Sequence, residues 1–294
     1  CIEMVNQFAE LVQLPDAAAH FLEDSFCTLT ERKEVLLLML DAMDDYFLGE
    51  EAVCISKLQQ AAAQSGLHEY VIDFLFLILC AKPLRYTYKR LDLPEKVYIA
   101  SMRDLKYKVL ECHKVYHIWG TFVFEWFRGF FLCDRMAFGR LQYERIPFPY
   151  DAYGQNLKRG DTVYNCHIPA CGPLTTESVL KSLKEAYGYY QPELKDGILP
   201  VVCLSWLLYP PHYMTFPENS NIQRFYKLFH IIDQHQEENC HDFWRIFGCQ
   251  YTKDPAGWPV DTTLQANFKQ YLASGNTMGE GFGILLFDGE NIVG

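Results

Sequence analysis

The sequence lacks an apolar stretch long enough to cross a membrane. Its longest apolar runs, around residues 70–80 and 199–208, are shorter than the roughly 18 to 20 residues that a transmembrane helix needs. Basic residues are also scarce, because 26 Lys and Arg stand against 37 Asp and Glu, which gives a net charge of −11. Such a chain repels a phosphate backbone, so we expect neither a nucleic-acid partner nor membrane insertion.

A Cys-x-x-Cys pair is absent, although the chain has 11 cysteines. Its absence excludes a zinc ribbon and a thioredoxin-like redox pair, and most of the cysteines lie in apolar segments typical of buried thiols. No second Cys or His pair accompanies Cys166 and Cys171, so we expect no metal. His113 and His117 have a metal-binding spacing but no acidic neighbour, which favours a helix-surface or interdomain role. The first residues are acidic where a secretion signal is basic, so we expect a cytoplasmic protein.

The apolar periodicity changes near residue 130. Residues 1–130 have the helical period and are punctuated by glycine and proline, so we predict an all-helical N-terminal domain. From residue 131 to 294, short apolar runs and amphipathic helices follow the order strand, strand, helix, strand, helix, strand, helix, strand. The fourth of these strands is placed at 243–251. We therefore predict an α+β fold, with a helical domain followed by a mixed sheet with flanking helices. In the first half, the glycines and prolines predicted to separate helices are Pro15, Gly49, Gly66, Pro83 and Pro94.

One segment has the pattern of an anion-binding site. A predicted strand, Thr162–His167, leads into the small-residue loop "ACGPLTT" and then into an amphipathic helix with Thr175 as its N-cap. Free backbone N–H groups and the positive end of the helix dipole point outward together in such a connection. An ordinary connection between a strand and a helix is the alternative.

A second segment, "NSNIQRFYKLF" at 219–229, opens a helix with polar residues. Ser220 and Gln223 fit a capping box, and an apolar face runs through Ile222, Phe225 and Tyr226. Asn219 together with these three residues resembles the late helix of the GNAT superfamily of N-acyltransferases. The superfamily pattern is Asn, then a small or apolar residue, then an aromatic-Tyr pair.

The resemblance covers residues 131–294, and the whole chain looks like bacterial two-domain proteins with a helical first half and a GNAT-like second half. It implies that acyl-CoA is the co-substrate, that an amine-bearing acceptor takes the acyl group directly, and that the loop binds the pyrophosphate. The loop departs from the superfamily pattern, because it has one glycine, Gly172, followed by Pro173, and no arginine. The cofactor-binding residues implied are Cys166, His167, Ile168, Ala170, Cys171, Gly172, Leu174, Thr175, Thr176, Asn219 and Asn221.

Three residues are candidates for catalysis. His167 at the end of the strand can act as a general base, or it can hydrogen-bond the loop backbone. Glu144, which shares its strand face with Gln142, can draw a proton from an amine through water, or it can face solvent. The resemblance implies that Tyr226 protonates the departing CoA thiolate, and the alternative is a core aromatic.

Two other functions fit the same residues. The departure of the loop from the superfamily pattern fits a GNAT-like module that binds CoA or a metabolite as a sensor without catalysis. Cys171, close to a helix start and four residues from His167, fits a thiol-dependent acyl hydrolase or transferase. The sequence carries no signal for the acceptor, the acyl chain length or the oligomeric state.

Overall fold

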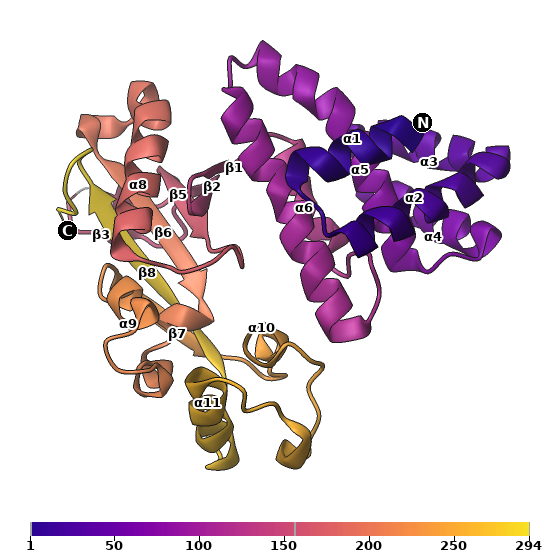
Figure 1. Ribbon diagram of the computed structural model, residues 1–294. Helices are drawn as coiled ribbons and strands as arrows, with labels where there is room; N and C mark the ends of the chain where they lie inside the picture. The colour runs from indigo at the N-terminus through magenta and orange to yellow at the C-terminus, as the bar shows by residue number, and fades with distance from the viewer. Residues whose placement is uncertain (1, 156, 294) are drawn as a thin grey trace. The chain divides into compact units, whose positions relative to one another are not determined.

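The computed structural model describes residues 2–155 and 157–293. Contacts within the chain divide it into two units, Cys1–Met136 and Ala137–Gly294. The first unit is built of helices, and the second holds a mixed sheet with flanking helices (Figure 1). The predicted α+β fold is therefore confirmed. None of the helices in the described part of the chain has the length and apolar character that crossing a bilayer requires.

The N-terminal unit is organised around helix α5. Residues 74–81 of this helix are all buried, so apolar side chains leave it in every direction. A helix of this kind has to be enclosed, and α5 contacts α2, α3, α4 and α6. The helices of the unit are α1 (Ile2–Val12), α2 (Asp16–Glu31), α3 (Lys33–Leu48), α4 (Glu51–Ser65), α5 (Glu69–Arg90), α6 (Glu95–Tyr116) and α7 (Arg128–Phe131).

Glycine and proline act differently at the predicted helix ends. Gly49 and Gly66 do end α3 and α4, each with a left-handed backbone. The prediction that Pro83 separates two helices is wrong, because it lies inside α5. Proline there removes the backbone hydrogen bond to the carbonyl of Leu79. Burial of the flanking turns, including Leu79 and Leu84, outweighs that loss.

The helical pattern after Pro94 also ends earlier than expected. Helix α6 stops at Tyr116, and His117 takes a left-handed conformation with φ of 60°. Gly120 then passes so close to the backbone of Tyr70 that a Cβ atom would collide with it. The N–H of Thr121 donates to the Tyr70 carbonyl at 2.9 Å. This contact with the start of α5 is a tertiary feature that helical periodicity does not reveal.

The C-terminal unit contains a six-stranded sheet in the order β1-β2-β5-β6-β8-β7 and a two-stranded sheet, β3-β4. Strands β5 and β6 are parallel, whereas β2–β5, β6–β8 and β7–β8 are antiparallel. The strands are β1 (Arg135–Phe138), β2 (Leu141–Pro147), β3 (Ala152–Tyr153), β4 (Leu157–Lys158), β5 (Thr162–His167), β6 (Leu199–Ser205), β7 (His230–Gln236) and β8 (Gly279–Phe287). The helices are α8 (Thr176–Tyr190), α9 (Asn221–Tyr226), α10 (Phe243–Phe247) and α11 (Thr263–Ala273).

The prediction of a strand at 243–251 is wrong. The segment forms the short helix α10, in which Phe243, Ile246 and Phe247 are buried at helical spacing. The strand between α9 and α11 is β7, which pairs with β8 at the edge of the sheet. Most side chains of β7 are exposed, so it lacks the apolar alternation that marks a half-buried strand.

Different elements cover the two faces of the large sheet. On one face α8 packs on β2, where the Ser182 hydroxyl lies 3.0 Å from the Tyr143 hydroxyl and accepts from the Leu141 N–H at 3.1 Å. The opposite face is covered in part by the small sheet and its flank. There Phe148 and Leu157 pack in one cluster with Val163, Val202, Phe282, Ile284 and Leu286.

Strand β8 has glycine at every second position where it faces the turn after β6. That turn is the 3₁₀ helix Trp206–Leu208, followed by Tyr209. A Cβ atom at Gly281 would collide with the carbonyl oxygen of Leu208, and one at Gly279 would lie 2.6 Å from the Tyr209 ring. Because these glycines have no side chain, the turn can pack closely against the sheet.

His212 is buried in an aromatic cage beside this turn. Its ring centroid lies 4.8 Å from that of Tyr209, 4.9 Å from that of Phe268 and 5.6 Å from that of Tyr271. Because a carbonyl only accepts, Nδ1–H is the donor to the Trp206 oxygen at 2.8 Å, and the ring is neutral with its proton on Nδ1. Burial lowers the pKa of His212 to about 4, against 6.5 for the free side chain.

The C-terminal unit should therefore lose stability as the pH falls from 6.5 to 4. In this window the unfolded chain binds a proton at His212 and the folded chain does not, so unfolding becomes more favourable. The shift corresponds to about 3 kcal/mol over the whole window. Hydrogen exchange of the β6 and β8 amides at several pH values measures this loss. His212→Phe should remove that part of the pH dependence, and parallel curves for wild type and variant would contradict the assignment.

Candidate active site

The loop between β5 and α8 combines a helix start with several backbone N–H donors. Thr175 caps α8, because its Oγ1 accepts from the Ser178 N–H at 3.1 Å. The backbone N–H groups of Gly172, Leu174 and Thr176 make no hydrogen bond to other residues that the structure describes. They stand at the positive end of the α8 dipole, which is the environment that an anion such as a phosphate requires.

Arg140 binds the same loop from the turn between β1 and β2. Its guanidinium donates to the carbonyls of Pro169 at 2.9 Å, Gly172 at 2.9 Å and Pro173 at 3.3 Å. These bonds draw loop carbonyls toward one cation and hold the loop in a fixed path. The loop contains no arginine of its own, but the fold brings one to it from a neighbouring hairpin.

The other residues predicted in the loop have different surroundings. Cys171 is half-buried, its N–H donates to the Pro169 carbonyl at 2.9 Å, and its Sγ lies 4.0 Å from the Arg140 oxygen. Leu174 is buried, Ile168 and Thr176 are half-buried, and Ala170 is exposed.

Cys166 precedes the loop and is buried. It pairs in register with Tyr143, so its side chain lies on the face of the sheet that packs against α8. A hydrogen bond with the Cys166 thiol, together with burial, raises the pKa of the Cys203 thiol well above its usual value. Ligand contact at Cys166 would therefore have to come from its backbone.

Glu144 and His167 form a pair on the opposite face. Antiparallel pairing of β2 and β5 sets Gln142 against His167 and Glu144 against Asn165, so the four side chains share one face. His167 Nε2 lies 2.8 Å from Glu144 Oε2, and their side chains are 18% and 21% exposed. A carboxylate accepts, so Nε2 carries the proton in this bond and Nδ1 is the basic nitrogen of the neutral ring. The pair is held by two strands and is still accessible from solvent.

Strands β5 and β6 pair over a short stretch next to Glu144 and His167. Their parallel pairing covers only Tyr164 with Val201 and Asn165 with Val202, although β6 continues to Ser205. Beyond these two pairs, no further ladder pair joins β5 and β6 in the described part of the chain. Backbone groups outside a ladder can offer donors and acceptors to an extended ligand, as a free sheet edge does.

Helix α9 confirms the predicted cap with one difference. Ser220 Oγ accepts from the Gln223 N–H at 3.2 Å, but the Gln223 side chain returns to the N–H of Asn219, at 3.0 Å, rather than to that of Ser220. Asn219 is exposed and has a left-handed φ of 56°. Asn221 accepts from Arg224 at 3.1 Å. Local hydrogen bonds explain the polar residues at 220, 221 and 223, and the left-handed backbone, which asparagine tolerates, explains Asn219.

Tyr226 lies at the end of α9 and is half-buried. Its ring centroid is 4.9 Å from that of Tyr213. Burial, followed by the charge of Tyr213, raises the pKa of Tyr226, so its hydroxyl keeps its proton at neutral pH. A protonated hydroxyl of this kind can donate a hydrogen bond.

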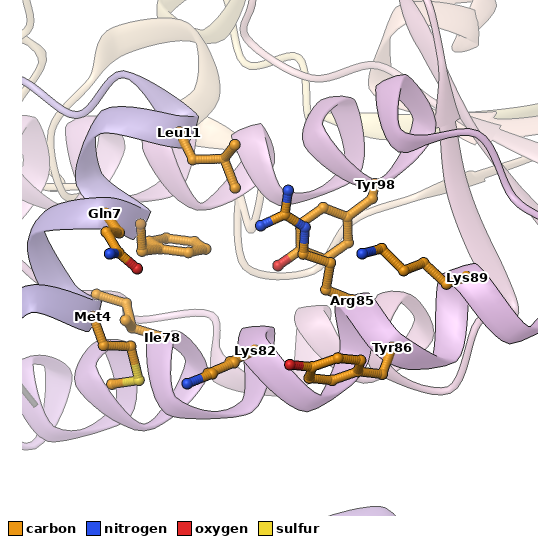
Figure 2. A pocket seen from close by; sticks show the side chains of 10 residues that line it. Met4, Gln7, Leu11, Ile78, Lys82, Arg85, Tyr86, Lys89 and Tyr98 are labelled. Atoms are coloured by element: carbon orange, nitrogen blue, oxygen red, sulfur yellow. The ribbon is translucent and has the colours of Figure 1, made fainter.

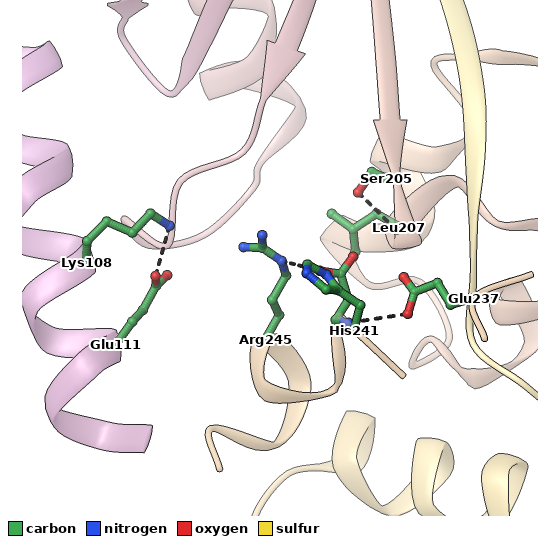
Figure 3. A network of polar contacts seen from close by, with 8 residues as sticks. Lys108, Glu111, Ser205, Leu207, Glu237, His241 and Arg245 are labelled. Carbon is green, nitrogen blue, oxygen red and sulfur yellow. Dashed lines mark hydrogen bonds and ion pairs between the residues drawn. The ribbon is translucent and has the colours of Figure 1, made fainter. Parts of the chain in front are cut away.

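The structure also gathers three carboxylates that the sequence does not bring together. Glu237, Asp242 and Glu280 have oxygen atoms within 4.8 Å of one another. Arg245 Nε lies 2.5 Å from Asp242 Oδ1, and His241 lies near the same oxygen (Figure 3). Burial, followed by the charge of Asp242, raises the pKa values of Glu237 and Glu280. Basic neighbours thus already offset part of this charge.

The two histidines at metal-binding spacing are engaged in ring contacts. His113 stacks on Trp119 with centroids 3.6 Å apart and planes 3° from parallel. The His113 and His117 rings are perpendicular, with centroids 6.3 Å apart. These contacts show a packing role for His113.

Comparisons with known proteins match both halves of the chain. Residues 3–133 match the model of the N-acyltransferase N-terminal domain, and residues 136–285 match that of the GNAT-like C-terminal domain. Among curated proteins, none matches the sequence.

Solved structures of acyltransferases have a similar fold. An acyltransferase mutant in complex with octanoyl-CoA has a TM-score of 0.76 and 16% identity, over 96% of this chain and 87% of that one. An acyltransferase in complex with decanoyl-CoA has a TM-score of 0.74 and 18% sequence identity, over 95% of this chain and 86% of that one. An acyltransferase in complex with decanoyl-CoA and teicoplanin has a TM-score of 0.73 and 17% sequence identity, over 95% of this chain and 86% of that one.

Proposed function

Because the chain belongs to the family with the GNAT-like C-terminal domain, we propose that it is an acyl-CoA-dependent N-acyltransferase that moves the acyl group directly to an amine. The observation that carries the proposal is the Glu144–His167 pair, 2.8 Å apart at the end of β5. The loop that follows β5 leads to N–H groups at a helix start that have no hydrogen-bond partner among the described residues. A base and an anion site therefore follow each other along one strand and its loop.

We assign the phosphate groups of CoA to the β5–α8 loop. The N–H groups of Gly172, Leu174 and Thr176 are its donors, and Pro173 supplies none because proline has no N–H. Arg140 compensates in part, since it holds the loop by its carbonyls and places a positive charge beside it. From this loop, the backbone of β5 and β6 beyond their ladder pairs would take the extended pantetheine arm toward His167.

The pair then serves as the base for the acceptor. An amine that attacks the thioester carbonyl forms the new C–N bond and has to lose a proton. We assign this proton to His167 Nδ1, while Glu144 stabilises the imidazolium through Nε2–H. Breaking of the C–S bond releases the CoA thiolate, and we assign the proton that it takes up to the Tyr226 hydroxyl.

Direct transfer is supported over a thiol-dependent route by the contacts of Cys171. Its Sγ lies against the Arg140 carbonyl, and the Nε2 of His167 is directed to Glu144. A nucleophilic cysteine requires a base in hydrogen-bonding reach. The backbone carbonyl beside Sγ is not such a base, and the dependence of CoA release on an amine acceptor separates the two routes.

A thermal-shift series with CoA, acetyl-CoA, octanoyl-CoA and decanoyl-CoA tests the first step. A ligand present at about 100 times its Kd stabilises the fold by about 2.7 kcal/mol, so the unfolding midpoint should rise clearly. Release of the CoA thiol is then followed with and without an amine acceptor, for which teicoplanin is one probe. Acceptor-independent release would identify a hydrolase, binding without any turnover would identify a sensor, and no shift with any thioester would refute the proposal.

The role of Tyr226 is tested in the same assay. Tyr226→Phe keeps the ring that packs on Tyr213, so a packing role predicts little loss of activity. A proton donor should instead lower kcat by about 10²-fold and leave acyl-CoA binding unchanged. Wild-type turnover in this variant would show that the thiolate leaves without the tyrosine proton.

A further inference from the structure

The N-terminal unit has a pocket of about 190 Å³ between α1 and α5, with Tyr98 of α6 at its wall. Its apolar lining comes from Met4, Phe8 and Leu11 of α1 and from Ile78 of α5. Figure 2 shows the α1 side chains opposite those of α5 across the opening. The Tyr98 hydroxyl is engaged with the Ala81 carbonyl at 2.8 Å, so the ring contributes an apolar wall. This pocket lies within one unit and shares no residue with the proposed active site.

The rim of this pocket is positively charged in a protein of net charge −11. Lys82, Arg85 and Lys89 follow one another along α5 and line the opening. Arg85 pairs with Glu95, but neither lysine forms an ion pair with any residue that the structure describes. Lys82 and Lys89 are seven residues apart, which corresponds to about 10 Å along a helix. Their ammonium groups are thus within reach of one anionic group at the mouth.

We propose that this pocket binds a single-chain alkyl carboxylate, with the alkyl chain against the α1 and Ile78 side chains and the carboxylate at Lys82 and Lys89. An apolar floor without charged groups selects the chain, because each buried methylene is withdrawn from water. Two ammonium groups that have no ion-pair partner among the described residues select a negative head, since charge-assisted hydrogen bonds are stronger than neutral ones. The site would respond to free fatty acid, a ligand different from the thioester of the proposed reaction.

The test uses the whole chain with octanoate and methyl-labelled methionine. The Met4 methyl resonance should shift on titration, whereas that of Met214, which is 84% exposed in the other unit, should not. Chain length is varied from hexanoate to decanoate. Each added methylene should tighten binding on the order of fourfold until the pocket is filled. Octanol, which has the chain without the charge, should bind at least tenfold more weakly than octanoate.

Charge reversal separates this pocket from other sites. Lys82→Glu with Lys89→Glu should weaken octanoate binding at least tenfold and leave octanol binding unchanged. The matched control, Lys33→Glu with Lys253→Glu, changes the net charge equally at two exposed lysines that are remote from the pocket in sequence. Octanoate binding by the rim variant at wild-type strength, equal binding of octanol, or displacement of octanoate from Met4 by saturating octanoyl-CoA would each overturn the proposal.

Discussion

Glu144→Gln is expected to lower kcat/KM for acyl transfer by about 10²-fold or more, with acyl-CoA affinity nearly unchanged. Glutamine keeps the size of the side chain and can still accept from His167 Nε2–H, but it carries no charge to stabilise the imidazolium. The barrier to proton removal rises, whereas the groups that would hold CoA are untouched. Steady-state kinetics with the amine acceptor, together with titration of acyl-CoA, measure the two effects separately.

The matched control is Glu193→Gln. Glu193 pairs with Arg145 at 2.9 Å, and Arg145 lies on the face of the sheet that packs against α8. The same isosteric change there should leave turnover near the wild-type rate. The pH profile adds a second readout, because removal of the Glu144 charge lowers the pKa of His167 and moves the acidic limb of kcat/KM to lower pH. Equal activity in both variants would remove Glu144 from the mechanism.

Gly172→Asp should abolish CoA binding at the concentrations that saturate wild type. The new carboxylate would stand beside the phosphate groups in the proposed loop, and like charges 4 Å apart repel by about 4 kcal/mol at a protein surface. The fold has space for the side chain, since a Cβ atom at Gly172 meets no other atom within 4 Å. Calorimetric titration with CoA gives the change in affinity, and the thermal midpoint without ligand shows whether the variant is folded.

Gly172→Asn is the control that separates charge from backbone strain. Gly172 has φ of 104°, which strains any side chain with a Cβ atom, and Asn and Asp share nearly the same shape. The two variants should therefore lose similar stability but differ in CoA affinity by at least about 10²-fold. That difference should shrink at high salt, because screening weakens the repulsion. Equal affinity of the two variants would place the phosphate groups elsewhere.

The sequence predicted the fold where one periodicity ran through a whole segment. Helical spacing in the first half and the strand–loop–helix at β5 and α8 are local features, and the structure contains both. Strand β7 was missed because an edge strand with exposed side chains on both faces has no apolar alternation. The segment 243–251 was misread because a run of aromatic residues suits a strand as well as a helix. Its buried positions, Phe243, Ile246 and Phe247, do have helical spacing.

The candidate site depended on contacts that the sequence does not contain. Glu144 and His167 were each recognised as possible bases, but their bond depends on the register between β2 and β5. In the sequence these two strands are separated by β3 and β4, which form a sheet of their own. Arg140 was missed as the cation of the loop, because it belongs to a hairpin rather than to the loop. Strand pairing decides both contacts, and pairing partners cannot be read from periodicity.

The alternating glycines of β8 also restrict how the sheet can assemble. Gly281 leaves room for the backbone of the turn after β6, Gly279 for the Tyr209 ring and Gly283 for the Leu208 side chain. Bulky Phe282 and Ile284 follow Gly281 and Gly283 in the strand. If β8 paired with β6 one residue out of register, these large side chains would point into the space that the turn occupies. A one-residue slip exchanges the two faces of a strand, so the misaligned chain could not seat the turn. The glycines therefore favour one register between two strands that are distant in sequence, because only that register leaves space for the turn to pack.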